Sequence, residues 1–440
     1  MFKKTFKVIA TAALLFTSAI QSAHALPSFA RQTGEACVAC HIGAFGPQLT
    51  PHGMQFKLGG YTDTDGKGGK VPLSVMMVEG FTHTKKDASE DVAAHLNNNN
   101  NLSMQELSLF LAGGINDHVG GFAQATWNDG DKKVNLDNVD LRVVNKTTYG
   151  DKDLVYGLTI NNNPTVQDPF NTLSAWRFPY TSSEWGPEYN ASPKIDGGLS
   201  QSVMGVSAYS FFDNSIYAEV GGYQSLSPSM IKKLNVDPVG KLDGIAPYWR
   251  LALFQDYKKQ AFNVGIFGMS AKLQPETYSN SGPYDKFKDI GVDASYQFLG
   301  TREHIWTANA SYVHEKMTLN ATDAENKHNN LNRLDISTSY HYDNTYGLSA
   351  GIFSVNGTKN EAMYGDSSVN LSPNTKGYIL QADYTPWGKD ESWGAPWANL
   401  KVGLQYTGYT KFNGSKNNYD GDGTNAKDNN TLFAFAWISF

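Results

Sequence analysis

Apolar and polar residues alternate along most of the chain after residue 72. Between 305 and 313, every second residue is apolar and shares one face of an extended strand: Trp306, Ala308, Ala310 and Tyr312. Period two over about eight to ten residues is the pattern of β-strands with one apolar and one polar face. About 16 such segments follow one another: 73–84, 101–115, 118–128, 134–145, 152–163, 201–212, 214–225, 245–257, 259–272, 286–298, 302–316, 329–343, 345–356, 374–386, 398–411 and 430–440.

The connections between these segments alternate in length. Short turns are expected near 116–117, 213–214, 257–258, 300–301 and 344, and long loops at 85–100, 164–200, 226–244, 273–285, 317–328, 357–373 and 412–429. An even number of strands with short turns at one end and long loops at the other is typical of outer-membrane β-barrels. A soluble β-sandwich, the alternative fold, gives no reason for this rhythm.

The last segment carries apolar residues at alternate positions and ends the chain on Phe440. In a soluble protein such an apolar edge would promote aggregation, whereas in a barrel it closes against the first strand. A final apolar strand ending in Phe also resembles the signal that barrel-insertion machinery reads. We therefore predict an all-β protein, with a roughly 16-stranded transmembrane antiparallel β-barrel over residues 73–440 in contact with outer-membrane lipid.

The N-terminus precedes the barrel and divides into two parts. Three lysines among the first seven residues, an apolar run over 8–20 and the small-x-small sequence Ala23-His24-Ala25 are typical of a secretory signal. We expect residues 1–25 to be a signal peptide and residues 26–72 to be a small module. Because so short a module rarely supplies its own core, we expect it to be seated in or at the lumen of the barrel.

Composition and charge exclude two classes of protein. The formal net charge of −6 gives no electrostatic case for binding nucleic acid. No apolar stretch of roughly 18 residues follows the signal, which excludes a helical membrane protein but not a barrel. Aromatic residues make up 12% of the chain, which suits the aromatic girdles of a barrel, although a soluble β-protein could share this value.

The strongest chemical signal is Cys37-Val38-Ala39-Cys40-His41, which contains the only two cysteines of the chain. C-x-x-C-H is the attachment signature of c-type haem, because two thiols at this spacing form thioethers and the next residue can bind the iron. The alternatives are a dithiol redox pair and half of a zinc site. A zinc site needs four ligands, and no second C-x-x-C or H-x3-H pair is present. We predict one covalent haem c held by Cys37, Cys40 and His41.

The residues around this motif resemble a known family. Phe29-Ala30-Arg31-Gln32-Thr33-Gly34, the haem motif, Leu49-Thr50-Pro51 with Gly53, and Phe56-Lys57-Leu58-Gly59-Gly60-Tyr61-Thr62 are similar to the monohaem cytochrome–porin fusions of the outer membrane. The best-known members are proposed Fe(II) oxidases. The resemblance is sharp over about 40 residues and only architectural over the barrel. His52 and Met54 stand where the family pattern has an aromatic residue and often an arginine.

Candidate site residues follow from the motif and from the strand pattern. His41 is the proximal iron ligand, and Arg31 is a candidate partner of a haem propionate. For the distal position, Met54, His83 and Met77 are candidates; Met77, Glu79 and His83 are predicted on the lumen face of the first strand, and an open sixth position is the alternative. Seven charged residues are predicted to line the lumen: Glu106, Asp140, Arg142, Arg333, Asp335, Asp383 and Lys401.

Two functions remain open on the sequence. The first is an outer-membrane electron-transfer protein that passes electrons from an extracellular donor, such as Fe(II), through the haem to a periplasmic cytochrome or other carrier. If Fe(II) is the donor, this protein is an Fe(II):cytochrome c oxidoreductase. The second is a diffusion porin in which the haem is structural or gates the pore. The haem module is expected toward the periplasm or inside the barrel.

Overall fold

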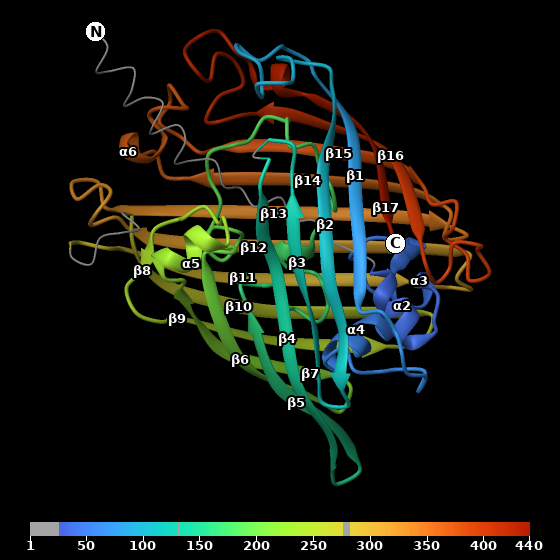
Figure 1. Cartoon of the computed structure of the whole chain (residues 1–440). Coiled ribbons are helices and arrows are strands. Elements are labelled where there is room, and N and C mark those ends of the chain that lie inside the picture. Colours follow the sequence, from blue (N-terminus) through green and yellow to red (C-terminus); the bar gives the residue numbers. More distant parts are fainter. Residues whose placement is uncertain (1–25, 131, 276–281) are drawn as a thin grey trace.

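A computed structural model describes residues 26–130, 132–275 and 282–440, so the predicted signal peptide lies outside the described residues. The strands form one antiparallel sheet that closes on itself, because β1 pairs with both β2 and β17. One of the 17 strands, β8 (Lys241–Leu242), only extends the pairing of β10. The other strands form the closed 16-stranded barrel that the sequence predicts (Figure 1).

The strand bounds agree with the predicted segments to within a few residues. They are β1 (Leu73–Thr84), β2 (Asn101–Asn116), β3 (Val119–Trp127), β4 (Val134–Tyr149), β5 (Lys152–Asn161), β6 (Val203–Phe212), β7 (Ile216–Ser225), β9 (Ala246–Asp256), β10 (Gln260–Gln274), β11 (Asp285–Phe298), β12 (His304–Thr318), β13 (His328–Tyr342), β14 (Tyr346–Gly357), β15 (Thr375–Tyr384), β16 (Asn399–Lys411) and β17 (Thr431–Ser439).

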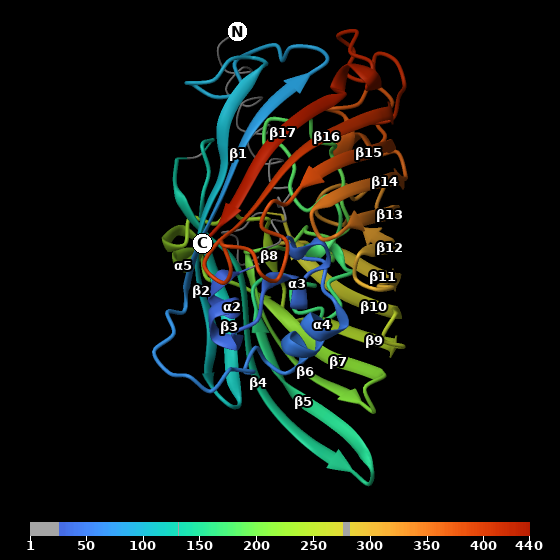
Figure 2. The same ribbon diagram turned by 90° about the vertical axis from the view of Figure 1, so that its right-hand side faces the viewer.

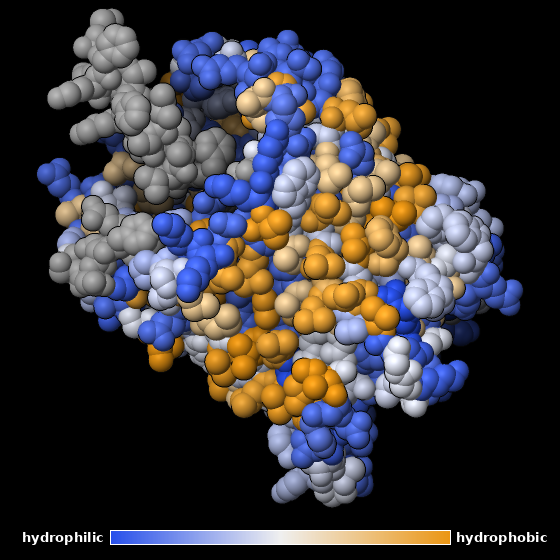
Figure 3. Space-filling model, in the orientation of Figure 1, coloured by the Kyte–Doolittle hydropathy of each residue, from blue (hydrophilic) through white to orange (hydrophobic). Residues whose placement is uncertain are grey.

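The outer surface of the barrel is apolar around its wall. Leu251, Ile290, Leu348 and Leu380 are each about half exposed or more, at 49%, 54%, 60% and 50%. On the face shown in Figure 3, hydrophobic residues gather across the middle of the wall, and hydrophilic residues lie above and below them. So large an apolar surface is stable in lipid and not in water. The barrel therefore has the surface of an outer-membrane protein.

The predicted lumen charges face inward. Glu106, Asp140, Arg142, Asp383 and Lys401 are all buried inside the barrel, with at most 8% of each residue exposed. The side chains of Arg333 and Asp335 are 11% and 14% exposed. The alternation of polar and apolar residues therefore assigned these faces correctly.

The prediction for β1 is wrong in its choice of face. Met76 and Val78 are fully buried in the lumen, whereas His83 is exposed and pairs in register with Leu432 of the outer face. Met77 and Glu79 share this outer face with His83. The sequence Val75-Met76-Met77-Val78 is apolar on both faces, so period two could not choose between them.

The N-terminal module closes the barrel at the end where the short turns lie. It consists of α2 (Pro27–Thr33), α3 (Cys37–Cys40), η1 (Ile42–Ala44) and α4 (Pro51–Leu58). Figure 2 shows these helices inside the ring of strands. Barrel side chains hold its backbone: Gln297 donates to the Leu49 carbonyl at 2.7 Å, and Tyr209 to the Leu58 carbonyl at 2.8 Å. None of the helices in the described part of the chain has the length and apolar composition to cross a membrane.

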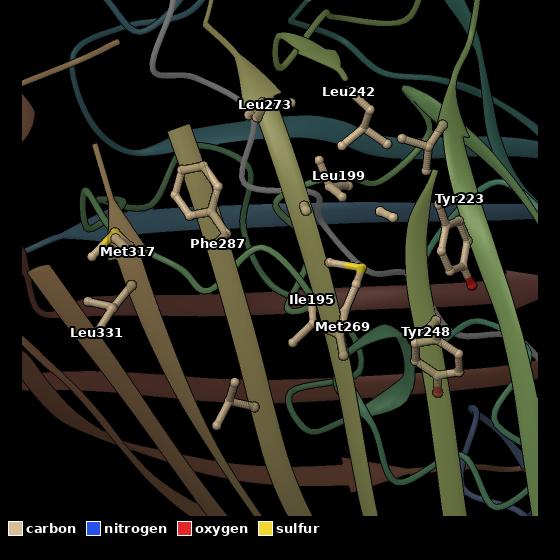
Figure 4. Close-up of a cluster of buried hydrophobic side chains, with 14 of the residues drawn as sticks. Ile195, Leu199, Tyr223, Leu242, Tyr248, Met269, Leu273, Phe287, Met317 and Leu331 are labelled. Carbon is tan, nitrogen blue, oxygen red and sulfur yellow. The ribbon is translucent and has the colours of Figure 1, made fainter. Parts of the chain in front are cut away.

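The long connection between β5 and β6, residues 162–202, folds into the lumen; it contains η2 (Ser174–Trp176). Ile195 and Leu199 of this lumen loop pack against the inner wall, together with residues from β7 to β13 (Figure 4). The other short helices, α5 (Pro228–Lys233), α6 (Glu361–Tyr364) and η3 (Ala426–Asn429), lie in loops between strands. The lumen loop and the module together fill much of the barrel interior.

Buried ion pairs fix the lumen loop to the wall. Arg250 of β9 contacts Asp293 of β11 through two bonds of 2.7 and 3.0 Å, and Asp168 of the loop at 3.4 Å. A second group joins Arg177 and Asp196 of the loop to Arg333 and Asp335 of β13. Since buried charges need partners, these groups specify where the loop lies.

We expect Arg250→Met to destabilise the barrel by about 3–5 kcal/mol, because it leaves Asp293 and Asp168 buried without their cation. Arg302→Met is the matched control, since Arg302 is exposed in a short turn. The measurement is the denaturant midpoint of the folded barrel, followed by the shift in migration of unheated samples. Equal midpoints for the two variants would contradict the role assigned to the Arg250 pairs.

Candidate functional site

The haem motif forms a single helical turn with both thiols on one side. Cys37 and Cys40 stand three residues apart in α3, and this spacing places them on the same helical face. They are half-buried and not joined in a disulfide. The backbone N–H of His41 donates to the Cys37 carbonyl at 2.9 Å, and His41 then pairs with Leu49 in a short antiparallel bridge. This bridge turns the chain directly after the motif.

Helix α4 packs closely against the motif. Thr50 caps its first turn by accepting from the Gly53 N–H, and the Thr50 hydroxyl donates to the Ala39 carbonyl at 2.6 Å. A Cβ atom at Gly53 would lie 2.3 Å from the Cys40 carbonyl oxygen. Only glycine at position 53 therefore allows α4 to approach the Cys40 backbone this closely.

We expect Gly53→Ala to displace α4, to destabilise the module by about 1–3 kcal/mol and to lower haem content. Gly68→Ala is the matched control, because a Cβ at Gly68 would meet nothing within 4 Å. The ratio of haem absorbance to protein, measured on both purified variants, tests this expectation. Unchanged haem content in Gly53→Ala would show that the close approach is not needed.

A cavity with about 770 Å³ of empty space, part of it open to solvent, lies between the module, the wall and the lumen loop. Its lining is largely apolar and aromatic, and it includes all three haem-motif residues. The lining residues are Leu26, Phe29, Ala30, Thr33, Glu35, Ala36, Cys37, Cys40, His41, Leu49, Gly53, Phe56, Lys57, Tyr61, Phe110, Phe122, Asn171 and Trp176.

The residues that line the cavity fit a c-type haem. Two thiols on one helical face can form the thioethers, and the apolar walls suit the porphyrin. Burial lowers the pKa of His41; the Gly46 backbone opposes this shift and Lys401 adds to it, and the resulting pKa is about 4. The imidazole is therefore neutral at physiological pH, which is the form that binds iron. Its Nδ1 atom is buried and makes no hydrogen bond of ordinary geometry.

Burial favours the protonated form of both thiols. Burial, together with the nearby Glu35 carboxylate, raises the pKa of Cys40 to about 12. Burial also raises the pKa of Cys37. A dithiol redox pair needs electropositive surroundings that stabilise the thiolate, which is the reactive form of cysteine. Neither cysteine in the folded protein has such surroundings. The environment thus disfavours the redox-pair alternative.

A polar network lies behind two residues of the cavity lining, Tyr61 and Lys57. The Tyr61 hydroxyl donates to Asp140 at 2.7 Å, and Arg142 contacts the same carboxylate at 2.9 Å. Arg142 also donates to the Lys57 carbonyl at 3.0 Å. Burial and the adjacent Asp140 raise the pKa of Tyr61, so its hydroxyl stays protonated. The network attaches the last turn of α4 to β4.

Arg31 and Met54 lie away from the cavity, which corrects their expected placement. The Arg31 guanidinium donates to the carbonyls of Val71 and Leu73 and stacks over Trp397 at 5.2 Å. Met54 is 2% exposed and packs into a cluster with wall aromatics, including Tyr209. Both residues belong to helices whose opposite faces line the cavity.

The other distal candidates are also placed elsewhere. Met77 and His83 lie on the outer face of β1, and His83 bonds Asn100 at 2.8 Å. His52 is exposed and pairs with Glu35 at 2.7 Å. The Glu35, Cys40 and His52 ligand atoms lie within 4.8 Å of one another. In the described part of the chain, His41 is the only histidine or methionine that lines the cavity.

Sequence reasoning missed the residues that barrel and loop contribute. Phe110 of β2 and Phe122 of β3 point inward although their strands are polar on that face. Trp176 and Asn171 come from the lumen loop. The two inward aromatics were the available signal, because they interrupt a polar face. Nothing in the pattern of the loop indicated that it enters the lumen.

No family model and no curated protein matches this chain. Among solved structures, OprB of Pseudomonas putida at high pH has a TM-score of 0.51 at 12% identity, over 84% of this chain and 94% of that one. The outer membrane channel DcaP of Acinetobacter baumannii has a TM-score of 0.46 at 13% identity, over 84% and 97%. An anion-selective porin from Comamonas acidovorans has 0.46 at 11%, over 83% and 98%. At these identities the likeness shows the barrel fold alone.

Proposed function

We propose that this chain is an outer-membrane electron-transfer protein that carries one covalent haem c in the mouth of its barrel. The cavity with Cys37, Cys40 and His41 in its lining is the observation that carries the proposal. A haem supplies one-electron chemistry, and the protein sets its potential through ligation and burial. The partners are outer-membrane lipid, the barrel-insertion machinery and a periplasmic carrier.

The position of the cavity suits transfer to a periplasmic carrier. It lies at the short-turn end of the barrel, and in outer-membrane barrels short turns face the periplasm. Glu35 and His52, at the edge of the motif, are exposed at this end. A carrier such as a periplasmic cytochrome can therefore approach the edge of the haem. The donor loses one electron on the opposite side, and the carrier gains it.

The similarity of the module to cytochrome–porin fusions suggests Fe(II) as the extracellular donor. In that case the protein acts as an Fe(II):cytochrome c oxidoreductase. Lumen charges of both signs, such as Asp383 and Lys401, create no strongly cationic or anionic channel. The donor is therefore a question for experiment, and reduced organic compounds are the other class to test.

The second candidate function is passage of small solutes through the barrel. The barrel fold and the polar lumen favour it. The module and the lumen loop disfavour it, because they occupy the interior. The loop is bound to the wall by the buried pairs of Arg250 with Asp168 and of Arg333 with Asp196, and the module by hydrogen bonds such as that from Gln297 to the Leu49 carbonyl. Passage would require these elements to move.

Proteoliposomes that enclose an oxidised soluble cytochrome c test the two functions together. We expect Fe(II) added outside to reduce the enclosed cytochrome when the protein is present, with no reduction in liposomes that contain the Cys37→Ala/Cys40→Ala variant. A donor too large for the lumen serves as the second substrate. Swelling of the liposomes in small sugars without any reduction of the cytochrome would favour the porin instead.

A further inference from the structure

Lys57 is a buried amine at the wall of the cavity. The residue lies in the last turn of α4 and is 3% exposed. Its Nζ atom donates to the Val166 carbonyl and to the Asn171 Oδ1 atom, each at 2.7 Å. It also lies 4.4 Å from the centroid of the Trp176 ring. All three partners come from the lumen loop, so the amine joins the module to that loop.

The amine has no anionic partner among the described residues, where no carboxylate oxygen lies within 4.0 Å of it. A buried ammonium without a carboxylate is costly, and such groups tend to lose their proton. Burial is the largest influence on the pKa of Lys57; together with the nearby Arg142 it outweighs the carboxylates of Asp140, Asp168 and Glu219, and the pKa falls to about 7. A substantial fraction of the side chain is therefore neutral near physiological pH.

The hydrogen bonds leave the lone pair of the neutral amine free. A neutral amine has two N–H donors and one lone pair, and two acceptors already take the donors. Because Lys57 lines the cavity, this amine lies at the wall of the space where a haem is expected. Val166 and Asn171 would then orient the ligand in the way that outer-shell partners orient metal ligands.

Besides Lys57 and the three haem-motif residues, the described lining holds two other side chains of a type that can bind iron, Glu35 and Tyr61. The Glu35 carboxylate pairs with His52 at 2.7 Å. Cys37 and Cys40 are the expected tethers and His41 is the expected proximal ligand. Tyr61 also lines the cavity, but its hydroxyl donates to Asp140, which disfavours the phenolate that binds iron. Met54 is turned toward the wall.

We propose that the Lys57 amine is the second axial ligand of the haem iron, an inference that rests on the haem of the proposed function. The ligand then comes from α4, one turn after the glycine that packs on Cys40. Its orientation depends on the lumen loop, so the state of the loop and the ligation of the haem are coupled. Nitrogen on both sides of the iron gives a lower potential than a nitrogen–thioether pair.

A rival role for Lys57 is charge pairing with a haem propionate. The two roles differ in the response to Lys57→Arg, because arginine keeps the positive charge but does not bind iron. Lys57→Ala removes both charge and ligand, and Lys57→Met replaces the amine by a thioether. Lys67→Ala is the matched control, since Lys67 is an exposed lysine of the same module.

Visible and electron paramagnetic resonance spectra of the full-length, haem-loaded proteins in detergent provide the test. We expect low-spin ferric spectra for the unmodified protein and Lys67→Ala, and high-spin spectra for both Lys57→Ala and Lys57→Arg. Lys57→Met is expected to regain a low-spin spectrum with a sulfur-to-iron band and a raised potential. Low-spin, unmodified spectra in Lys57→Ala and Lys57→Arg would overturn the proposal, and a change in Lys57→Ala but not in Lys57→Arg would assign the charge role instead.

Haem content separates this inference from the proposed function. Protein that folds into a barrel but carries no covalent haem overturns both. Protein that carries covalent haem, but whose spectrum does not depend on Lys57, overturns only the ligand. The shift in migration of unheated samples reports whether each variant has formed the barrel. If Lys57→Ala fails to fold, Lys57→Met keeps an unbranched side chain that is only one atom shorter than lysine.

Discussion

Covalent haem is expected to disappear completely in Cys37→Ala/Cys40→Ala, while the barrel still assembles. The thiols are the only two in the chain, and they share one face of α3 beside the cavity. No other residue can form the thioethers, so haem lost during denaturing electrophoresis measures this directly. Val38→Ala, in the same helical turn, is the control that removes side-chain atoms without removing a thiol.

The single-cysteine variants extend this expectation. Each should keep some haem through one thioether and lose the rest on denaturation. A haem-stained band of normal intensity in the double variant would contradict the assignment of the motif, as would a haem-free band in the unmodified protein after expression with c-type haem maturation factors. Loss of the barrel in the double variant would show instead that the haem is needed for folding.

Deletion of residues 26–70 is expected to turn a barrel of low conductance into an open pore. The module lies within the ring of strands and is bound to the wall at many points, among them the 2.8 Å bond from Asn399 to the Ala44 carbonyl. Its removal opens one mouth of the barrel. Single-channel recordings in planar bilayers should show a large increase in conductance over the intact protein.

Cys37→Ala/Cys40→Ala is the control for this deletion, because it keeps the module and removes the haem. Its conductance should remain low. If the deletion variant conducts no better than the intact protein, the lumen loop alone closes the barrel. The next variant to test is then one without the Arg250 ion pair that holds the loop to the wall. If the intact protein already conducts strongly, the module does not close the mouth.

The fold was predictable because a barrel strand has a strict period and a fixed environment. Successive residues of each strand face the polar lumen and the lipid in turn, so the chemistry of Gln381 and Leu380 alone reveals their faces. This logic failed where both faces are apolar. Met76 and Trp437 point inward and belong to the same apolar cluster as module residues such as Phe45, so that part of the wall faces protein and not water.

The doubly apolar strands were therefore informative in a way that period two does not capture. β17 carries Phe433, Phe435 and Trp437 inward and a second apolar series outward. An inward apolar face beside a polar lumen indicates that something apolar fills the lumen there. Phe45 of the module packs on Trp437 with 4.9 Å between ring centroids. The site of the plug could have been predicted from this pattern.

Cys37, Cys40 and His41 of the candidate site were predicted from a local motif, whereas the remaining walls of the site depend on tertiary contacts. Arg31 and Lys57 are both cations of the module, and the sequence around them does not indicate which of the two lines the cavity. The fold directs Arg31 to backbone carbonyls and directs Lys57 to the cavity. Which face of a short helix meets the haem follows from how the module docks, and docking is set by the barrel and the lumen loop.

An anaerobic visible spectrum of the detergent-purified protein, recorded before and after addition of Fe(II) at neutral pH, tests the central claim most directly. We predict one haem per chain, a ferric spectrum at the start and the sharp bands of a ferrous c-type haem after addition. A purified barrel without haem absorbance would contradict the account. A haem that dithionite reduces but Fe(II) leaves oxidised would contradict Fe(II) as the donor.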